Sequence, residues 1–401
     1  MSAGEKTVNK VRRSRNTLLG GSILGAAALA ISTVAVPATA DAQDRTVTSG
    51  MDTVSLAVSG QVNRALMLVG DGEDTTLFNA DNNASSSRVR FIGEASPTAD
   101  ITAGAAIEVE FRVNNTFTLS QDQRGGIDDT AFRNRRVEVY FDHTDFGRVW
   151  LGMGWTATEF IAEQDLSGTA IAGYSDPRVM GGGMFFRDST TGELDRSFRM
   201  LNVADNMDGF GRDTRIRYDT PRVNGFQIRT SLVNDEAFDV GLWYQDKIDR
   251  FQISSAIGWA NDSRRIRGVD NQFQRPVQEF DDIISGSFSV LDDSGLNATF
   301  AAGRQDRRAS GPDANFWYGK LGYQANMFPE MGTTAFSVDW HRSEDIAQAG
   351  DELDAIGFQI VQNVDWLGTE FYGAFRNHSF DRDGRSFDDL NIGMIGARVR
   401  F

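Results

Sequence analysis

Cysteine is absent from the sequence, so disulfide bonds, thiol catalysis and thiolate metal sites are excluded. Proline is scarce, with 7 residues in 401, and only 3 histidines are available for acid–base chemistry. Lys and Arg (40) are outnumbered by Asp and Glu (56), and the formal net charge of −16 argues against nucleic-acid binding, because phosphate contacts need a basic surface. After residue 40 no apolar run reaches about 18 residues, so we expect no membrane-spanning helix.

The first forty residues have the three parts of a secretory signal peptide. Five basic residues up to Arg15 precede an apolar run over 18–36, and Ala38-Thr39-Ala40 is a small-x-small cleavage site. A membrane anchor is the alternative, which the high Ala and Gly content disfavours. We therefore expect residues 1–40 to be cleaved and residues 41–401 to form a single domain.

From about residue 53 onward, apolar and polar residues alternate in segments that short turn signals separate. In residues 101–113 (ITAGAAIEVEFRV), apolar side chains occupy one face, while Glu108, Glu110 and Arg112 occupy the other. This period of two predicts β-strands. We predict about sixteen of them, an even number that suits an up-and-down meander, at 53–68, 86–95, 101–113, 131–142, 147–155, 211–220, 224–234, 236–247, 249–260, 278–291, 295–305, 315–326, 332–342, 353–363, 367–378 and 389–401.

The length and charge of these segments favour a transmembrane barrel over a soluble β-sandwich. Strands are usually about five or six residues long, whereas a tilted strand that crosses a bilayer needs about 9–11 residues. The polar face carries many charges, which a water-filled lumen can solvate and a closed core cannot. Short turns also alternate with longer polar connections, as on the two rims of an outer-membrane barrel. We predict an all-β, 16-stranded antiparallel transmembrane β-barrel, which at this size leaves an aqueous channel.

The last predicted strand ends in GARVRF, with Gly396, Val399 and Phe401 in a pattern that resembles the C-terminal signature of bacterial outer-membrane proteins. The resemblance implies that the outer-membrane assembly machinery recognises these residues. In a closed barrel this strand pairs with the first one. Ile392 and Met394 are out of phase with the rest of the strand, which indicates either a bulge near Gly393 or a part of the strand that packs differently.

One connection, residues 156–210, is far longer than the others and lacks alternation. A loop of this length is normally functional or disordered. It follows the fifth predicted strand, and residues 146–160 (FGRVWLGMGWTATEF) with residues 167–188 resemble the strand and loop of alphaproteobacterial-type trimeric general porins of Gram-negative bacteria. The resemblance implies an outer-membrane homotrimer in contact with lipid and lipopolysaccharide, in which residues 156–210 fold into the barrel and narrow the pore.

The same resemblance implies two sets of opposed charges at the constriction. The acidic set on the long connection comprises Glu159, Glu163, Asp165 and Asp176. The basic set on the barrel wall comprises Arg88, Arg90, Arg112 and Arg136, with Arg148, Arg215 and Arg217 as further candidates. Ordinary solvation of a wet lumen is the alternative explanation for each residue taken singly.

No catalytic, phosphate-binding or zinc motif occurs in the sequence, so we expect neither enzymatic activity nor a cofactor. Structural calcium at Asp pairs such as Asp128-Asp129 and Asp292-Asp293 is an alternative to solvated turns. We expect passive diffusion of small hydrophilic solutes and ions. A substrate-specific sugar or anion channel, a non-conducting barrel, a soluble periplasmic protein and a barrel hydrolase that uses His378-Ser379 are the alternatives.

Overall fold

The computed structural model describes residues 45–48, 54–125, 132–233, 237–261, 280–307 and 312–401, which lie within one compact unit, Ala35–Phe401. The expected signal peptide and the Asp128-Asp129 pair lie outside the described residues. Within those ranges, no helix is long and apolar enough to span a membrane.

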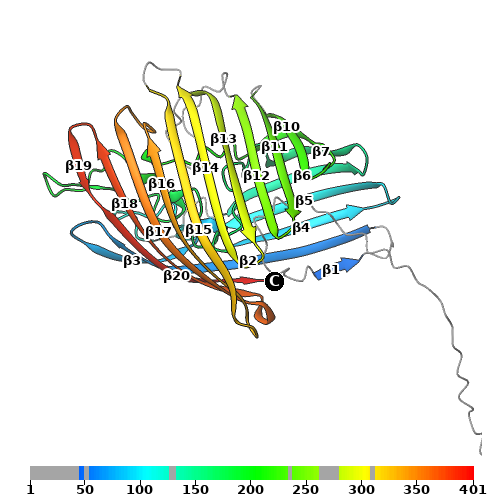
Figure 1. Ribbon diagram of the computed structural model, residues 1–401, viewed down its shortest axis with the longest axis horizontal. Coiled ribbons are helices and arrows are strands. Elements are labelled where there is room, and N and C mark those ends of the chain that lie inside the picture. The colour runs from blue at the N-terminus through cyan, green and yellow to red at the C-terminus, as the bar shows by residue number, and fades with distance from the viewer. Residues whose placement is uncertain (1–44, 49–53, 126–131, 234–236, 262–279, 308–311) are drawn as a thin grey trace, which may run out of the picture. The chain divides into compact units, whose positions relative to one another are not determined.

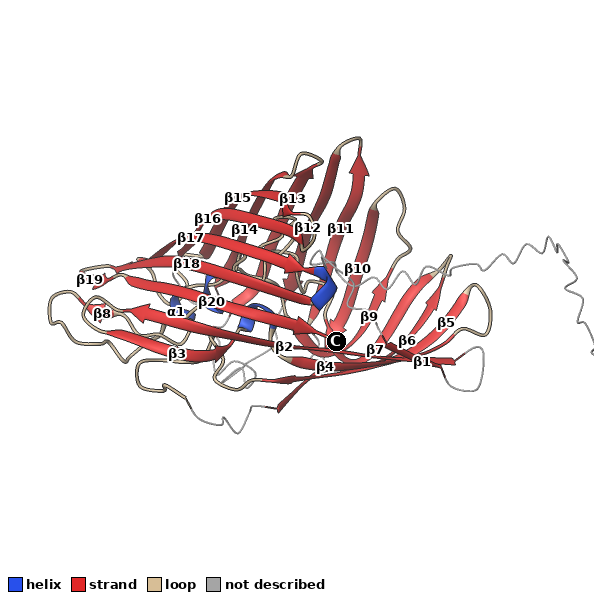
Figure 2. Ribbon diagram, turned by 90° about the horizontal axis from the view of Figure 1, so that it is seen from below, coloured by secondary structure: helices blue, strands red, loops and turns tan. Residues whose placement is uncertain are grey.

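Sixteen antiparallel strands form a closed barrel (Figures 1 and 2), as the alternation predicted. Each strand pairs with its neighbours in the order of the chain, and the last strand pairs with the first. The wall strands are β2 (Val54–Gly70), β4 (Arg88–Ala95), β5 (Ile101–Phe111), β6 (Phe132–His143), β7 (Gly147–Trp155), β9 (Arg212–Asp219), β10 (Phe226–Val233), β11 (Phe238–Ile248), β12 (Phe251–Asn261), β13 (Phe280–Asp292), β14 (Leu296–Arg307), β15 (Ala314–Phe328), β16 (Gly332–Glu344), β17 (Asp351–Val364), β18 (Thr369–Arg382) and β20 (Leu390–Arg400).

The barrel is closed between β2 and β20, where Gln61 is opposite Arg400 and Gly70 is opposite Asn391. At the end of this ladder, Phe401 exchanges two backbone hydrogen bonds with Gly60, of 2.7 and 3.0 Å. A Cβ atom on Gly60 would lie only 2.7 Å from the Phe401 ring, so any larger residue at position 60 requires the ring to move. Closing the sheet in this way leaves no unpaired strand edge in the membrane.

Short turns join β4 to β5, β6 to β7, β9 to β10, β11 to β12, β13 to β14, β15 to β16 and β17 to β18, and we call this end of the barrel the short-turn rim. The opposite end, the long-loop rim, carries smaller elements that alternation did not reveal. These are β3 (Thr75–Asp81), which pairs with β2, and β8 (Arg187–Asp188), which pairs with β19 (Arg385–Asp388). The remaining elements are β1 (Arg45–Thr48), α1 (Met200–Val203) and 3-10 turns at Asn83–Ser85, Pro177–Val179 and Asp365–Leu367.

The two faces of the wall differ in chemistry. The outer face exposes large apolar side chains on successive strands, such as Ile107, Ile216, Ile228, Phe288 and Ile356. The alternate residues point inward and include many charged groups that are nearly inaccessible, such as Glu108, Arg217 and Lys320. The wall therefore has the apolar outside and polar inside of a membrane barrel.

The inner face of β20 is apolar near the long-loop rim and charged near the short-turn rim. The pairing of β20 with both neighbours runs without a shift, so there is no bulge at Gly393. Ile392 and Met394 instead point inward and join a buried apolar cluster that includes Met180 and Met184 of the long connection. The part of β20 near the long-loop rim therefore packs differently from the rest, as one of the two explanations predicted, because it contacts protein and not water.

Candidate functional site

Residues 156–210 are hydrogen-bonded to the inner face of the barrel through a row of hydroxyl groups. Ser231 on β10 accepts a bond from the Ala157 amide (3.0 Å), and Ser287 and Ser289 on β13 accept bonds from Gln164 (3.0 Å) and Leu166 (2.9 Å). A serine hydroxyl both accepts and donates, and Ser287 also donates to the Ile161 carbonyl. Small hydroxyl side chains let the backbone of the segment approach the wall closely.

Charged side chains add two further anchors. The Asp239 carboxylate accepts hydrogen bonds from the amide and hydroxyl of Thr158 (3.0 and 2.6 Å). The Lys320 ammonium on β15 binds the Asp165 carboxylate at 2.7 Å and the Gly173 carbonyl at 2.8 Å. Both Lys320 and Asp165 are almost fully buried, so this ion pair fixes the middle of the segment to β15.

Three of the four predicted acids are held in ion pairs. Glu159 binds Arg212 at 3.0 Å, Asp165 binds Lys320, and Asp176 binds Arg178 at 2.6 Å. Glu163 differs, because among the described residues it has no ion-pair partner and only accepts a hydrogen bond from Asn206 (2.9 Å). Burial and the nearby carboxylates of Glu159 and Asp176 raise the pKa of Glu163 to about 8.

Asp208 also belongs to this acidic group, although no pattern in the sequence pointed to it. Its carboxylate accepts hydrogen bonds from the amides of Phe160 (2.6 Å) and Ala162 (2.8 Å), which closes the two ends of the segment against each other. Burial and the charge of Glu163 raise the pKa of Asp208 well above its usual range. Glu163 and Asp208 thus lack a cationic partner in the described part of the chain, as does Glu193, which is exposed.

The four predicted arginines point into the barrel and are paired with acids of the wall. Arg88 and Arg90 both reach Glu108, at 3.5 and 2.6 Å. The other pairs join Arg112 to Glu110 (2.7 Å) and Arg136 to Glu138. Of the further candidates, Arg148 binds Asp142, Arg215 binds Glu138 and Arg217 binds Asp219.

Arg135 belongs to the same basic wall and was missed because alternation fails at that position. The register between β5 and β6 shifts so that Glu108 is opposite Arg136 and Val109 is opposite Asn134, which leaves Arg135 as an extra residue. Arg135 and Arg136 are therefore both buried, and Arg135 binds Glu108 (2.5 Å) and Glu110 (2.7 Å). A bulge cannot be read from a sequence in which several consecutive residues are polar.

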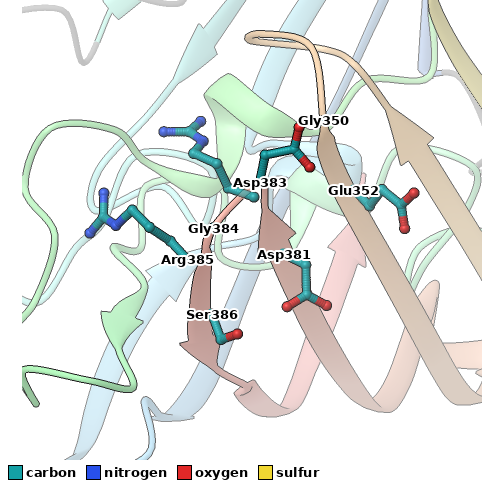
Figure 3. A pocket seen from close by; sticks show the side chains of 8 residues that line it. Gly350, Glu352, Asp381, Asp383, Gly384, Arg385 and Ser386 are labelled. Carbon is teal, nitrogen blue, oxygen red and sulfur yellow. The ribbon is translucent and has the colours of Figure 1, made fainter.

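The structure does not bring together the residues that the sequence suggested for hydrolysis. His378 is buried on the inner face of β18, and the next residue, Ser379, points to the opposite face, so the two cannot form a catalytic pair. Among the described side chains, no group of three or more His, Cys, Asp or Glu is arranged to hold a metal ion. A polar pocket of about 380 Å³ lies at the long-loop ends of β17 to β19, lined by residues such as Glu352, Asp383 and Arg385, and shares no residue with the charged groups above (Figure 3).

The chain is similar to proteins of known family and known structure. A family model described as Gram-negative porin matches residues 25–383. Among solved structures, the anion-selective porin from Comamonas acidovorans has a TM-score of 0.58 at 18% identity and covers 87% of this chain and 100% of its own. OmpF from Salmonella typhi in complex with daunomycin gives 0.55 at 11% identity (89% and 100%), and the trimer form of in-vitro folded OmpT from Vibrio cholerae gives 0.53 at 13% (87% and 100%). At these identities the structures show a common fold. None of the curated proteins that were compared matches the chain.

Proposed function

The chain belongs to the Gram-negative porin family and is an outer-membrane channel, and we propose that it is a general diffusion pore constricted by residues 156–210. The observation that carries this proposal is the row of hydrogen bonds from Ser231, Ser287 and Ser289 to the backbone of the segment. A segment bonded to the inner face takes up part of the water-filled cross-section. The size and charge of the remaining opening then decide which solutes pass.

Opposed charges support a constriction that selects for small polar solutes. Arginines of β4, β6 and β9 line the wall, and the segment adds Glu163 and Asp208, which become negatively charged above their raised pKa values. Such groups create a transverse field that favours ions and dipoles over apolar solutes, which must give up hydration water. The wall acids Glu108 and Glu138 neutralise part of the arginine charge, which favours a general pore over a dedicated anion channel.

A homotrimer is our proposal for the assembly, supported by a charged group on the membrane-facing surface. Arg64 on β2 lies between Val62 and Leu66, whose side chains are about half exposed on the outer face. Its guanidinium donates to the Val113 carbonyl and to the Asn79 side chain, both at 2.7 Å. A lipid-facing arginine is unfavourable to an extent that depends on its depth in the bilayer. A neighbouring subunit that supplies polar partners for Arg64 lowers this cost.

We further propose export by cleavage after Ala40 and recognition of Gly396, Val399 and Phe401 by the assembly machinery. The expected contact with lipopolysaccharide remains part of this proposal, as does the absence of enzymatic activity and of a cofactor, structural calcium included. Phe401 is exposed at the end of β20, where an assembly factor can reach it.

Single-channel recording in a planar bilayer with a salt gradient tests the proposed function. We expect stable open channels, in groups of three steps if the trimer inserts as a unit, and a liposome-swelling rate that falls with solute size. Protein that is folded and inserted but carries no current would overturn the proposal.

A further inference from the structure

Arg229 on β10 is a buried arginine without a carboxylate partner. Only 1% of its surface is exposed, and its Nε donates to the Gln227 side-chain oxygen at 3.0 Å. Its Nη1 is buried and has no acceptor among the described residues. The neighbouring inner-face arginines are different, because Arg215 binds Glu138 and Arg217 binds Asp219. Asp219 lies directly opposite Arg229 in the ladder with β9 but is bound by Arg217, so the two arginines share one carboxylate and the group keeps a net positive charge.

The indole of Trp243 lies against Arg229 and is also unsatisfied. The guanidinium carbon is 4.0 Å from the centre of the Trp243 ring. Trp243 is fully buried, and its Nε1 group has no acceptor in the part of the chain that the structure describes. Residue 241, which lies opposite Arg229 in the ladder, is a glycine, so no side chain separates the guanidinium from the indole.

Arg222 adds a third set of donors at the short-turn rim. This exposed residue donates to the Gly225 carbonyl at 2.7 Å and approaches the same Gln227 oxygen at 3.4 Å. The orientation of the Gln227 amide is fixed, because its nitrogen donates to the Thr220 carbonyl at 2.9 Å. One amide oxygen therefore serves two arginines.

The nearest carboxylate is already engaged. Both oxygens of Asp219 accept bonds from Arg217, at 2.7 and 2.9 Å, and one of them also accepts from Trp150 at 3.1 Å. An uncompensated buried charge is strongly destabilising, and buried polar groups in proteins almost always have partners. Among the described residues, the Nη1 of Arg229 and the Nε1 of Trp243 have no acceptor, and Arg222 beside them has no ion-pair partner.

We propose that Arg222, Arg229 and Trp243 form a binding subsite for a small oxyanion at the short-turn end of the pore. Guanidinium groups bind phosphate and carboxylate oxygens through charge-assisted hydrogen bonds, and an indole N–H supplies one more donor. The ligand comes from the aqueous solution and not from lipid, because Arg229 lies on the inner face of β10, while its neighbour Ile228 is on the outer face. This inference rests on the proposed function in that an open pore must deliver the anion.

The subsite is a binding position for anions in the channel, separate from the carboxylates of residues 156–210. Because only 1% of Arg229 is exposed, an oxyanion first contacts the exposed Arg222 and reaches Arg229 only when these side chains move. Binding there holds small oxyanions in the channel longer than chloride, because the separate oxygen atoms of an oxyanion match guanidinium donors in a bidentate geometry that a single chloride atom lacks.

The folded protein in a non-ionic detergent without phospholipid allows a direct test, with sodium phosphate titrated against sodium chloride at constant ionic strength. Tryptophan fluorescence and the unfolding temperature are the two readouts. We expect phosphate to raise the unfolding temperature by mass action and to change the fluorescence. Arg229→Gln should weaken phosphate binding by about tenfold or more. Trp243→Phe should abolish most of the fluorescence change.

Arg250→Gln is the matched control, because Arg250 is also an arginine at the short-turn rim but is paired with Asp292. It should bind phosphate like the natural protein. If Arg229→Gln fails to fold, Arg222→Gln on the exposed turn serves instead, with a smaller loss of affinity expected. Equal effects of phosphate and chloride on the natural protein, or unchanged affinity in both glutamine variants, would overturn the proposal. Channel recordings on the same samples separate this result from a failure of the pore itself.

Discussion

The ammonium group of Lys320 lies 2.7 Å from the carboxylate of Asp165, although 155 residues separate the two in the chain. This buried pair connects β15 to the segment that we propose as the constriction. Replacing Lys320 with Met leaves the Asp165 charge without its partner, and removing one member of a buried pair typically costs about 3–5 kcal/mol. We expect Lys320→Met to loosen the segment, with noisier and larger single-channel currents.

The double variant Lys320→Met, Asp165→Asn is the control for this prediction. It removes both charges, so the barrel should recover most of its stability and its quiet current. Identical currents in the single variant and the natural protein would show that the pair does not hold the segment.

We expect Glu163 to make the ion selectivity of the pore depend on pH. Its pKa is raised to about 8, so the carboxylate is ionised above that pH and protonated below it. The pKa of Asp208 is raised as well, whereas Glu159 and Asp176 are compensated by Arg212 and Arg178. Cation preference should therefore fall as the pH decreases from 9 to 6. Reversal potentials across a KCl gradient measure this change. In Glu163→Gln the reversal potential should depend less on pH than in the natural protein.

Arg90 should oppose the acids of the segment from the wall. About a quarter of its side chain is exposed (26%), more than that of Arg88 (15%) or Arg135 (9%). We expect Arg90→Gln to raise the cation-to-anion permeability ratio by a factor on the order of two. Arg250→Gln, at the short-turn rim, serves as the charge-matched control. A shift of the ratio toward anions in Arg90→Gln would contradict the assignment.

Gly60 should be required for closure of the barrel. A Cβ atom there would lie 2.7 Å from the Phe401 ring and 3.0 Å from the Arg88 carbonyl. Overpacking of this kind costs about 1–3 kcal/mol, so Gly60→Ala should lower the yield of heat-resistant folded barrel on a gel. Gly93→Ala is the matched control, because nothing lies within 4 Å of a Cβ atom at that position on β4. Equal yields for the two variants would show that Phe401 can move without cost.

The strands could be predicted because a wall with lipid on one side and water on the other imposes a strict period of two. Where protein and not water fills the barrel, inward-facing residues can be apolar and the alternation is lost. Ile392 and Met394, which pack against the long connection, are an example. The β3 hairpin and the Arg135 bulge were missed for a related reason, since both depend on backbone register and not on composition.

The candidate site was predicted less completely than the fold. The resemblance supplied Glu163 and the wall arginines, and the structure shows that these arginines face inward. It did not supply the ion-pair partners Arg212, Lys320 and Arg178, because pairs between distant segments have no local signal. Asp208 was missed because its role comes from two amide groups at the other end of the segment.

The three serines that hold residues 156–210 against the wall bind the backbone of the segment and not its side chains. Ser231, Ser287 and Ser289 accept hydrogen bonds from backbone amide groups, which every residue except proline possesses. These contacts do not depend on the side chains at positions 157, 164 and 166, so the backbone attachment itself persists when those side chains change. Most other side chains between residues 156 and 188 are buried, so changes of charge or width in the constriction are confined to its partly exposed positions, such as Glu163.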